Sequence, residues 1–411
     1  MDRSTGFRGY LPVASAGYHK CVTEPSVPAE NSLPIVADTR PPAVVETALP
    51  VAETAAPHGE TALPVLCGRN RRELETWLVG LKEPAYRGRQ IAAWIYQRGA
   101  RAFAEMTDLP AALRARLRES AVLGRAEVEA RQRAVDGTVK LLLRFVDGRA
   151  VETVLLPYED RTSVCISSQV GCPVGCVFCA TAMLGFARNL TAGEMVDQVL
   201  AARSHAPGER VSHVVVMGMG EPLLNYDPLV TALRLLHEEV GLSYRHLTVS
   251  TAGHVPGMRR LAHEGLPVTL AVSLHAPNDA LRERLIPMAR KWNLEVVMDA
   301  AEEYSVQTGR RVTLEYLVLG GVNDGQDQAK ELAKLARGSF HHVNLIPWNP
   351  ATTLEHFRSP RPERLKKFRE ALEERGVTVT QRVERGQEID AACGQLALVA
   401  AHGEERLVRI A

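Results

Sequence analysis

The sequence predicts an α/β fold of six parallel strands with crossover helices, preceded by a small helical segment and a few antiparallel strands. Beyond residue 160, short apolar runs rich in β-branched residues alternate with amphipathic helical stretches, a pattern typical of βα units. Two Asp-Gly pairs before that point indicate hairpins. The chain has 411 residues, 45% of them hydrophobic and 24% charged, which is enough for one large α/β domain with smaller additions.

The first 68 residues are rich in Ala, Pro, Val, Thr and Glu and contain the hexapeptide ETALPV twice, at 46–51 and 60–65. Such a segment buries too little surface to offset the entropy lost on ordering it. We therefore predict a disordered tail over residues 1–68 and a short C-terminal tail over 401–411. Cys21 and Cys67 lie in or beside the first tail without a Cys or His partner at ligand spacing, so we interpret them as incidental thiols.

Residues 69–123 are predicted to form a small basic helical domain. The stretches ELETWLVGL and RGRQIAAWIYQRG have apolar residues at helical spacing, with Arg87, Arg89, Arg98 and Arg101 nearby. Residues 69–149 hold 17 basic and 10 acidic side chains, although the whole chain has a net charge of +1. This excess can supply phosphate contacts, so we predict an RNA-binding accessory domain. The alternative is a solvated arginine-rich face.

Residues 124–157 are predicted to form short antiparallel strands, because Asp136-Gly137 and Asp147-Gly148 are hairpin signals. These strands form a small sheet of their own or extend a larger one. A core over 158–400 follows, with candidate strands at 163–168, 212–218, 246–251, 267–275, 311–319 and 341–347. An open or closed barrel is favoured over a doubly wound nucleotide-binding sheet, because GMGEPL at 218–223 lacks the third glycine of the dinucleotide fingerprint.

Polar residues gather where the candidate strands end. Folds built from βα units place their active sites at the carboxyl ends of the strands. Taken singly, however, each such residue is more often a cap or a turn residue. The residues concerned are Glu221, Ser250, Ser273, His275 and Asn349.

Three cysteines lie within eight residues, at Cys172, Cys176 and Cys179. Four thiolates normally complete a [4Fe–4S] cluster, so three leave one iron open to an outside ligand. Structural zinc would need a fourth Cys or His, and Cys165 and His205 are not at ligand spacing. The motif predicts an iron–sulfur cluster with one open iron, and the alternatives are zinc or a cluster that only transfers electrons.

The cysteines and the apolar runs also bear on the compartment. Seven cysteines, an odd number, occur in a chain far too large to need disulfide staples, and clustered thiols then favour metal or catalytic use in a reducing compartment. The sequence contains no run of 18 apolar residues and no secretory signal pattern. We therefore expect a cytoplasmic protein without a membrane span.

The cysteine motif after the first strand of a six-fold βα pattern resembles that of the radical S-adenosylmethionine (SAM) superfamily. Five stretches together resemble the RlmN family of rRNA and tRNA adenine-C2 methyltransferases over roughly residues 70–400: SSQVGCPVGCVFCATAMLGFARNL, MGMGEPLLN, SLHAPNDALRERLIP, NLIPWNP and DAACGQL. The resemblance implies a partial (β/α)6 radical SAM barrel and a [4Fe–4S] cluster on the three clustered cysteines, with SAM on the open iron. The related Cfr enzymes, which methylate adenine at C8, are the alternative.

The resemblance also implies roles for individual residues. Contacts to SAM would come from Gly220, Glu221, Ser250, Ser273, Leu274, His275 and Asn349. An aromatic C2–H is neither acidic nor nucleophilic, so a methyl carrier that can become a radical is required. The resemblance implies that Cys393 is this carrier, with two SAM molecules used per turnover. Glu152 would then remove the C2 proton, and Cys165 would attack the Cys393 sulfur, forming a disulfide and freeing the base.

Pattern alone gives a different reading of one of these residues. An acidic residue on an alternating strand, such as Glu152, is expected to face solvent. Cys165 is expected to point inward from the first strand of the barrel, near the cluster loop, which agrees with a resolving thiol.

The implied substrates are adenine 2503 of 23S rRNA and adenine 37 of tRNA. The implied partners also include an electron donor such as flavodoxin or ferredoxin, and the enzyme is expected to be a monomer. A different class of protein, a non-catalytic RNA-binding or iron–sulfur regulatory protein, would need the cluster but not Cys165, Cys393 and the SAM contacts as well. Their joint presence favours the enzyme.

Overall fold

The computed structural model describes residues 63–206, 210–336, 341–350, 354, 357–383 and 385–396. Nearly all of the predicted N-terminal tail, with Cys21, and the predicted C-terminal tail lie outside these residues. For residues 63–68 the predicted disorder is wrong. Val65 forms a parallel β-bridge with Val122, and both Leu66 and Cys67 are buried in the core. The Cys67 Sγ also lies 3.5 Å from the carbonyl oxygen of Gly193, so this thiol is a packed core residue.

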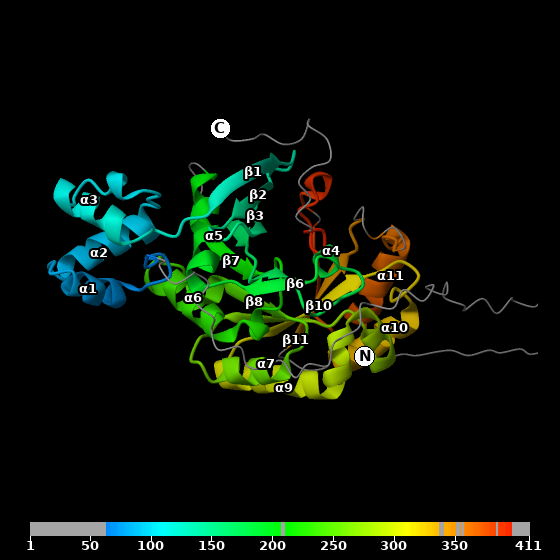
Figure 1. Cartoon of the computed structure of the whole chain (residues 1–411). Helices are drawn as coiled ribbons and strands as arrows, with labels where there is room; N and C mark the ends of the chain where they lie inside the picture. Colours follow the sequence, from blue (N-terminus) through cyan, green and yellow to red (C-terminus); the bar gives the residue numbers. More distant parts are fainter. Residues whose placement is uncertain are drawn as a thin grey trace, which may run out of the picture. The chain divides into compact units, whose positions relative to one another are not determined.

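Short helices follow this first bridge (Figure 1). The first begins at Asn70, whose side chain accepts a hydrogen bond from the Glu73 N–H while the Glu73 carboxylate accepts from the Asn70 N–H. This capping box satisfies two backbone donors that the helix itself leaves free. Leu74 and Leu78 lie one turn apart and are completely buried. The helices are α1 (Arg71–Gly80), α2 (Tyr86–Ala92), the π-helix η1 (Ala93–Gln97), η2 (Phe103–Glu105) and α3 (Ala111–Ser120).

A buried ion pair fastens the end of this helical segment to the core. The Arg125 guanidinium bonds to the Asp197 carboxylate on helix α5 (Ala192–Ser204), and their side chains are 3% and 0% exposed. The second oxygen of Asp197 accepts from the Ala126 N–H at 2.6 Å. Because each charge has several partners, the free-energy cost of removing it from water is offset. The ion pair thereby fixes the path of the chain where it leaves the helices.

The sheet has ten strands in the order β1-β2-β3-β4-β7-β8-β9-β10-β11-β12 (Figure 1). Strands β1 to β4 are antiparallel and the strands from β4 onward are parallel. The sheet is open over the described residues, since β1 and β12 each have one neighbour. The strands are β1 (Glu127–Arg133), β2 (Val139–Arg144), β3 (Ala150–Pro157), β4 (Thr162–Cys165), β7 (Val211–Val216), β8 (Leu247–Thr251), β9 (Thr269–Ser273), β10 (Val312–Val318), β11 (His341–Pro347) and β12 (Val379–Gln381).

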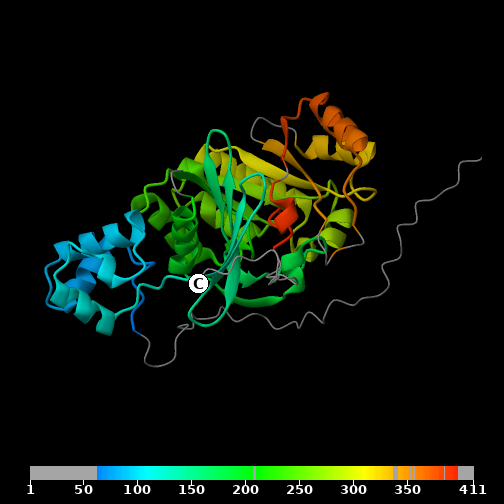
Figure 2. The same ribbon diagram turned by 90° about the horizontal axis from the view of Figure 1, so that it is seen from above.

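The six predicted strands are β4 and β7 to β11, which are parallel and follow the chain order, and this confirms the predicted α/β class. Strand β12 adds a seventh parallel strand that was not predicted. The sequence left two possibilities for the hairpin strands, a small sheet of their own or an extension of a larger one. The structure shows that the two Asp-Gly hairpins extend the large sheet (Figure 2). At each turn the aspartate accepts a backbone N–H two residues on, and the glycine has a φ of +84° or +78°, as these turns require. The division of the chain into domains at 123/124 and 157/158 stays a prediction.

Helices connect the parallel strands, and the helices of the pairs α5–α6, α7–α9 and α10–α11 lie side by side. None of the helices in the described residues is long and apolar enough to cross a membrane. The helices after α5 are α6 (Tyr226–Glu238), α7 (Val255–Ala262), α8 (Asp279–Leu285), α9 (Leu294–Thr308), α10 (Gln326–Leu335) and α11 (Pro362–Glu373), with short turns η3 (Pro222–Leu224), η4 (Tyr244–His246), η5 (Pro287–Lys291) and η6 (Gln387–Ile389).

Candidate active site

One face of the sheet carries the polar side chains. Directly paired residues on neighbouring strands point to the same face, and Cys165 pairs with Val154 on β3 and with Val215 on β7. The residues on the opposite face are mostly apolar and pack against the helices. Following the register across the sheet from Cys165 places the following residues on its face: Lys140, Glu152, Ser250, Ser273, Glu315 and Asn344.

The three clustered cysteines lie on a loop between β5 (Gln169–Gly171) and β6 (Phe186–Asn189), which pair as a separate small hairpin. Cys172 follows β5, and Cys179 is the N-cap of the short helix α4 (Ala180–Met183). The Cys172 N–H donates to the Gly185 carbonyl at 2.8 Å. All three cysteine side chains are partly buried and pack against one apolar cluster.

Bound metal ions would stabilise the thiolate forms of these buried cysteines. Burial raises the pKa of Cys172 to about 12. Burial is also the largest cause of the raised pKa of Cys176, and the charges of Cys179 and Cys172 come next. The three thiolates therefore repel one another, and metal ions would remove this penalty.

No group of three or more His, Cys, Asp and Glu side chains among the described residues could hold a single metal ion. A [4Fe–4S] cluster instead takes one thiolate on each iron, so its ligands stand apart. A second observation agrees with a bound anionic cluster. The Arg282 side chain is completely buried, its Nη1 has no hydrogen-bond partner, and its charge acts on Cys176. The donor set thus fits a cluster better than a single ion.

Gly220 and Glu221 form a tight turn after β7. Gly220 has a φ of +107°, and a Cβ there would lie 2.7 Å from the side chains of Gln169 and Ser168, so only glycine fits. The buried Glu221 carboxylate accepts the N–H groups of Leu223 at 3.1 Å and Ala252 at 2.7 Å. Burial raises the pKa of Glu221 to about 7. A cationic group beside it would favour the ionised form.

His275 follows β9 in the left-handed region, with a φ of +57°. Its Nδ1 accepts a hydrogen bond from the Leu317 N–H at 3.0 Å, so the imidazole is neutral with its proton on Nε2. Burial, and then the charge of Arg282, lower the pKa of His275 to about 3. Its ring meets Phe178 of the cysteine loop edge-on, with centroids 5.0 Å apart. These contacts bring the end of β9 to the cysteine loop.

The other predicted SAM-binding residues lie at the same ends of the parallel strands. The Ser250 hydroxyl donates to the Val216 carbonyl at 2.8 Å. Ser273 is partly buried, whereas the Leu274 side chain is completely buried. The Leu274 N–H donates to the Glu315 carbonyl at 3.0 Å, and its carbonyl accepts from Arg282 Nε at 3.3 Å. Asn349 is buried after β11.

The segment around Cys393 packs against the cysteine loop, although 214 residues separate Cys393 from Cys179. The Ala180 N–H donates to the Gly394 carbonyl at 2.8 Å, and the Thr181 hydroxyl donates to the Leu396 carbonyl at 2.6 Å. Burial, and then the charge of Cys393, raise the pKa of Cys165 to about 12. The structure therefore brings the three sets of cysteines predicted from sequence into one region.

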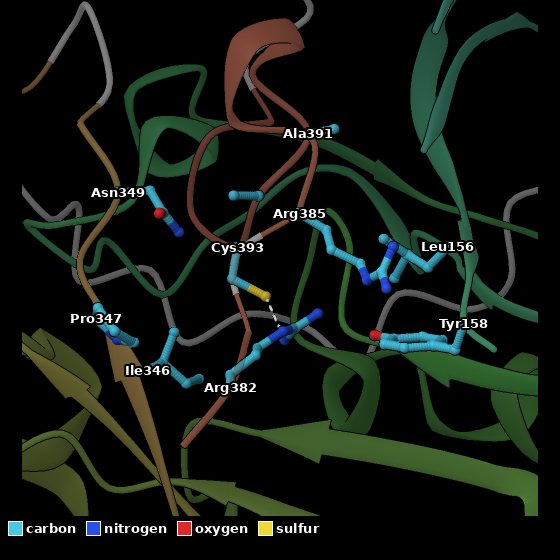
Figure 3. Close-up of a pocket in the computed structure, with 10 residues that line it drawn as sticks. Leu156, Tyr158, Ile346, Pro347, Asn349, Arg382, Arg385, Ala391 and Cys393 are labelled. Carbon is cyan, nitrogen blue, oxygen red and sulfur yellow. Dashed lines mark hydrogen bonds between the residues drawn. The ribbon is translucent and has the colours of Figure 1, made fainter. Parts of the chain in front are cut away.

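A pocket opens beside Cys393, with an empty volume of about 350 Å³ (Figure 3). The pocket is lined by Leu156, Tyr158, Ile346, Pro347, Asn349, Arg382, Arg385, Ala391, Ala392 and Cys393.

The six cysteines that the structure describes are all free thiols, so a disulfide is not formed in this state.

Glu152 is not on the solvent face that pattern alone predicts. It is 2% exposed, and its Oε1 lies 2.9 Å from Nζ of the equally buried Lys140 on β2. The Lys140 Nζ also donates to the Asp390 carbonyl at 3.2 Å, three residues before Cys393. The expectation of exposure is wrong because β3 is buried on both faces, so the alternation along it carries no information.

Three charged residues of this region were missed in the sequence: Lys140, Arg282 and Arg382. Lys140 stands in the apolar stretch TVKLLLRFV, and a charge within such a strand signals a buried partner. The register then places Lys140 one diagonal step from Glu152. Arg382 lies in a polar stretch with no comparable signal, and only the fold brings it to Cys393.

Arginines that were predicted to bind RNA already bond to other groups of the protein. Arg89 lies 3.1 Å from Glu75, and Arg98 lies 3.5 Å from Asp108. The Arg101 guanidinium donates to a backbone carbonyl of the following linker at 2.5 Å. Arg101 therefore has a structural role as well, and other exposed arginines are better candidates for phosphate contacts.

Comparison with known proteins gives the family. Residues 166–336 match the radical SAM superfamily, and residues 65–123 match the ribosomal RNA large subunit methyltransferase N-terminal domain. A protein of Symbiobacterium thermophilum named "Probable dual-specificity RNA methyltransferase RlmN" is 51% identical over 335 residues, which cover 80% of this chain and 90% of that protein. The chain belongs to the RlmN family of radical SAM RNA methyltransferases.

Further RlmN relatives agree. The protein of the same name from Thermosynechococcus vestitus is 49% identical over 332 residues, covering 81% of this chain and 98% of that protein. The crystal structure of a radical SAM methyltransferase from Sphaerobacter thermophilus is 48% identical, covers 81% of this chain and 99% of its own, and has a TM-score of 0.79. This likeness confirms the predicted radical SAM fold.

Membership in the RlmN family confirms the predicted enzyme class and excludes the non-catalytic alternative. It also implies a [4Fe–4S] cluster and SAM, the cofactors of the radical SAM family.

Proposed function

We propose that the enzyme methylates C2 of adenine 2503 in 23S rRNA and of adenine 37 in tRNA. The relatives' name describes dual specificity for RNA, and the matched N-terminal domain is named for ribosomal RNA. The observation that carries the proposal is the packing of the Cys393 segment against the cysteine loop, with Cys165 and Glu152 on the adjoining sheet face. A methyl carrier, a resolving thiol and a base are thereby close to one cluster site.

In this proposal Cys172, Cys176 and Cys179 each ligate one iron of the cluster. Residues at the strand ends would hold SAM, and Glu221 would bind its amino group because a buried carboxylate favours a cation. Its ribose and carboxylate are held by Ser250, Ser273, Leu274, His275 and Asn349. When bound, the cluster supplies the electron that cleaves SAM to a 5′-deoxyadenosyl radical.

The protein's own residues then act in sequence. Cys393 takes a methyl group from a first SAM, loses a hydrogen atom from that group to the radical, and adds to C2 through the resulting methylene. Glu152 removes the C2 proton, and its Oε1 lies 2.9 Å from the Lys140 Nζ. The unpaired electron of the adduct would return to the cluster. Cys165 then attacks the Cys393 sulfur and forms a disulfide, and the carbon–sulfur electron pair leaves with the base, which takes up a proton to complete its methyl group.

The remaining parts of the proposal concern partners. An external electron donor such as flavodoxin or ferredoxin supplies the reducing equivalents. The enzyme acts as a cytoplasmic monomer, and the basic helical segment at 69–123 holds the RNA through phosphate contacts.

The methylated position is the decisive test of the proposed function. The reduced, cluster-loaded enzyme is incubated with SAM and with either a 23S rRNA fragment or tRNA, and the RNA is digested to nucleosides. Mass analysis against standards should find 2-methyladenosine in both RNAs. If 8-methyladenosine forms instead, the Cfr-like alternative holds, and unmethylated tRNA would restrict the enzyme to rRNA.

The RNA-binding role of the helical segment predicts a charge-reversal phenotype. Arg72 on α1 and Arg118 on α3 are exposed, so changing both to Glu should weaken RNA binding about tenfold or more and lower the salt dependence by about one unit per lost phosphate contact. The matched control reverses Arg245 and Arg311, which are exposed at the amino ends of β8 and β10. Equal losses in both variants would contradict the prediction.

A further inference from the structure

Arg382 is the charged residue in contact with the Cys393 sulfur. Its Nη1 donates to Sγ of Cys393 at 2.9 Å, the bond drawn as a dashed line in Figure 3. The backbone N–H of Arg382 donates to the Leu345 carbonyl at 2.8 Å, directly after β12. The side chain therefore starts from a fixed point of the sheet and reaches into the pocket that Cys393 lines.

The groups around Arg382 are mainly potential anions. The charge of Cys393 is the largest cause of the raised pKa of Arg382, and Tyr158, Glu315 and Cys165 add to it. Glu315 is buried on β10, where its Oε2 accepts from the Asn344 side chain at 2.8 Å. Arg382 thus lies where a permanent positive charge is paired with a sulfur able to become negative.

Other charged groups also face this region. Lys140 reaches the Asp390 carbonyl of the Cys393 segment at 3.2 Å, and the Arg385 guanidinium lies 4.7 Å from the centre of the Tyr158 ring. Both are positive, so they add to the effect of Arg382. Burial raises the pKa of Cys179, and the charge of Cys393 adds a smaller contribution. Among the residues that the structure describes, Arg382 is the cation that donates a hydrogen bond to the sulfur itself.

Methyl transfer to Cys393 requires the thiolate, because a neutral thiol is a poor nucleophile. We propose that Arg382 is a catalytic residue that holds Cys393 as the thiolate that attacks the methyl carbon of SAM. The proton leaves to solvent when the thiolate forms. The Cys393 S–CH3 bond then forms as the sulfonium S–CH3 bond breaks, and its electron pair leaves with S-adenosylhomocysteine, so no electron is gained or lost overall.

The guanidinium suits this task. Arginine stays protonated at any physiological pH, so it keeps its charge beside a buried sulfur. Once Cys393 is a neutral thioether, the attraction between the two side chains is largely lost. This inference rests on the proposed role of Cys393 as methyl carrier.

The test measures the ionisation of Cys393 directly. Cluster-loaded enzyme is treated with iodoacetamide across a pH series, and the alkylation of unmethylated Cys393 is followed by peptide mass analysis. In Arg382→Gln the pH midpoint of Cys393 alkylation should rise by about one pH unit or more. The alkylation rate near pH 7 should then fall about tenfold. Arg375→Gln is the control, since Arg375 follows the end of α11 and its Nη1 donates to the Ala371 carbonyl of that helix. Its alkylation midpoint should not move.

The same variants are then given SAM without RNA, and methylated Cys393 is counted. Arg382→Gln should methylate Cys393 about tenfold more slowly near pH 7, and a high pH should restore the rate because the thiolate then forms unaided. A merely structural role would not be rescued by pH. Arg382→Lys keeps the charge, so its midpoint should stay within about half a unit of the wild type.

The outcomes separate this inference from the proposed function. An unchanged alkylation midpoint in Arg382→Gln, or a shift in Arg382→Lys as large as in Arg382→Gln, overturns the role of Arg382 alone. If Arg382→Gln fails to hold its cluster, the Arg382→Lys midpoint decides. RNA methylation that survives in Cys393→Ala overturns the proposed function, whatever the alkylation results are.

Discussion

Cys165→Ala should leave the enzyme covalently bonded to its RNA, whereas Cys393→Ala should form no bond at all. Both thiols lie in one region, since the charge of Cys393 acts on Cys165, yet the proposal gives them successive roles. Without Cys165 the methyl transfer, radical formation and attack on adenine still proceed. The reaction then stops, because no thiol attacks the Cys393 sulfur to free the base.

The measurement is a denaturing gel after an anaerobic single-turnover reaction with labelled RNA. A protein–RNA band should appear for Cys165→Ala, and nuclease digestion followed by mass analysis should place the remaining nucleotide on Cys393. Cys393→Ala should give neither a band nor methylated RNA. The control is Cys67→Ala, which alters a buried thiol packed against Gly193 on α5 and should methylate RNA normally.

Two outcomes would contradict this division of labour. A band in both cysteine variants would mean that another residue carries the methylene. A band in neither, with product formed by Cys165→Ala, would mean that the base is released without a resolving thiol. The enzyme class would stand in either case.

The parallel strands could be predicted because both faces of such a sheet are buried. The runs SHVVVMG and RVTLEYLVL are almost continuously apolar, as strands covered on both faces require. Because these runs are almost continuously apolar, the sequence does not show which face of the sheet carries the polar residues. Glu315 and Asn344 are single polar residues inside apolar strands, and the register alone shows that they share a face with Cys165 and Ser273.

Short elements could not be predicted in the same way. Strands β5 and β12 have three residues each, which is too short for a period-two pattern to stand out. The four residues of β6 are exposed or partly buried, so they lack an apolar signal. Yet β5 and β6 hold the two ends of the cysteine loop, whose function was evident from the spacing of its thiols.

Contacts at the site between distant parts of the chain could not be predicted from the sequence either. Cys393 could be proposed from its motif. Its hydrogen bond from Arg382 and the bonds of its segment to α4, however, join parts of the chain that only the complete fold brings together. Glu152 and Lys140 are nearer in sequence, and their pairing follows from the hairpin register. The local geometry was therefore within reach of the sequence, whereas the electrostatics of the methyl carrier was not.

Replacing Cys172, Cys176 or Cys179 by Ala should remove the cluster and SAM cleavage together. Each thiolate ligates one iron in the proposal, and a cluster left with two protein ligands is exposed to loss. Anaerobically reconstituted wild-type enzyme should bind about four irons and four sulfides, and reduction with SAM should yield 5′-deoxyadenosine. In each variant both the iron content and 5′-deoxyadenosine should fall to background.

The backbone of the cysteine loop should keep its fold in these variants. The loss of cluster and activity can then be assigned to the missing thiolate. Its backbone is held by the Cys172 N–H bond to the Gly185 carbonyl and by the Val177 N–H bond to the Leu285 carbonyl at 3.1 Å, and neither needs a thiol. Thermal unfolding of the metal-free variants should therefore match that of metal-free wild type. Bound zinc instead of iron, or a full cluster retained in all three variants, would show that these cysteines serve another purpose.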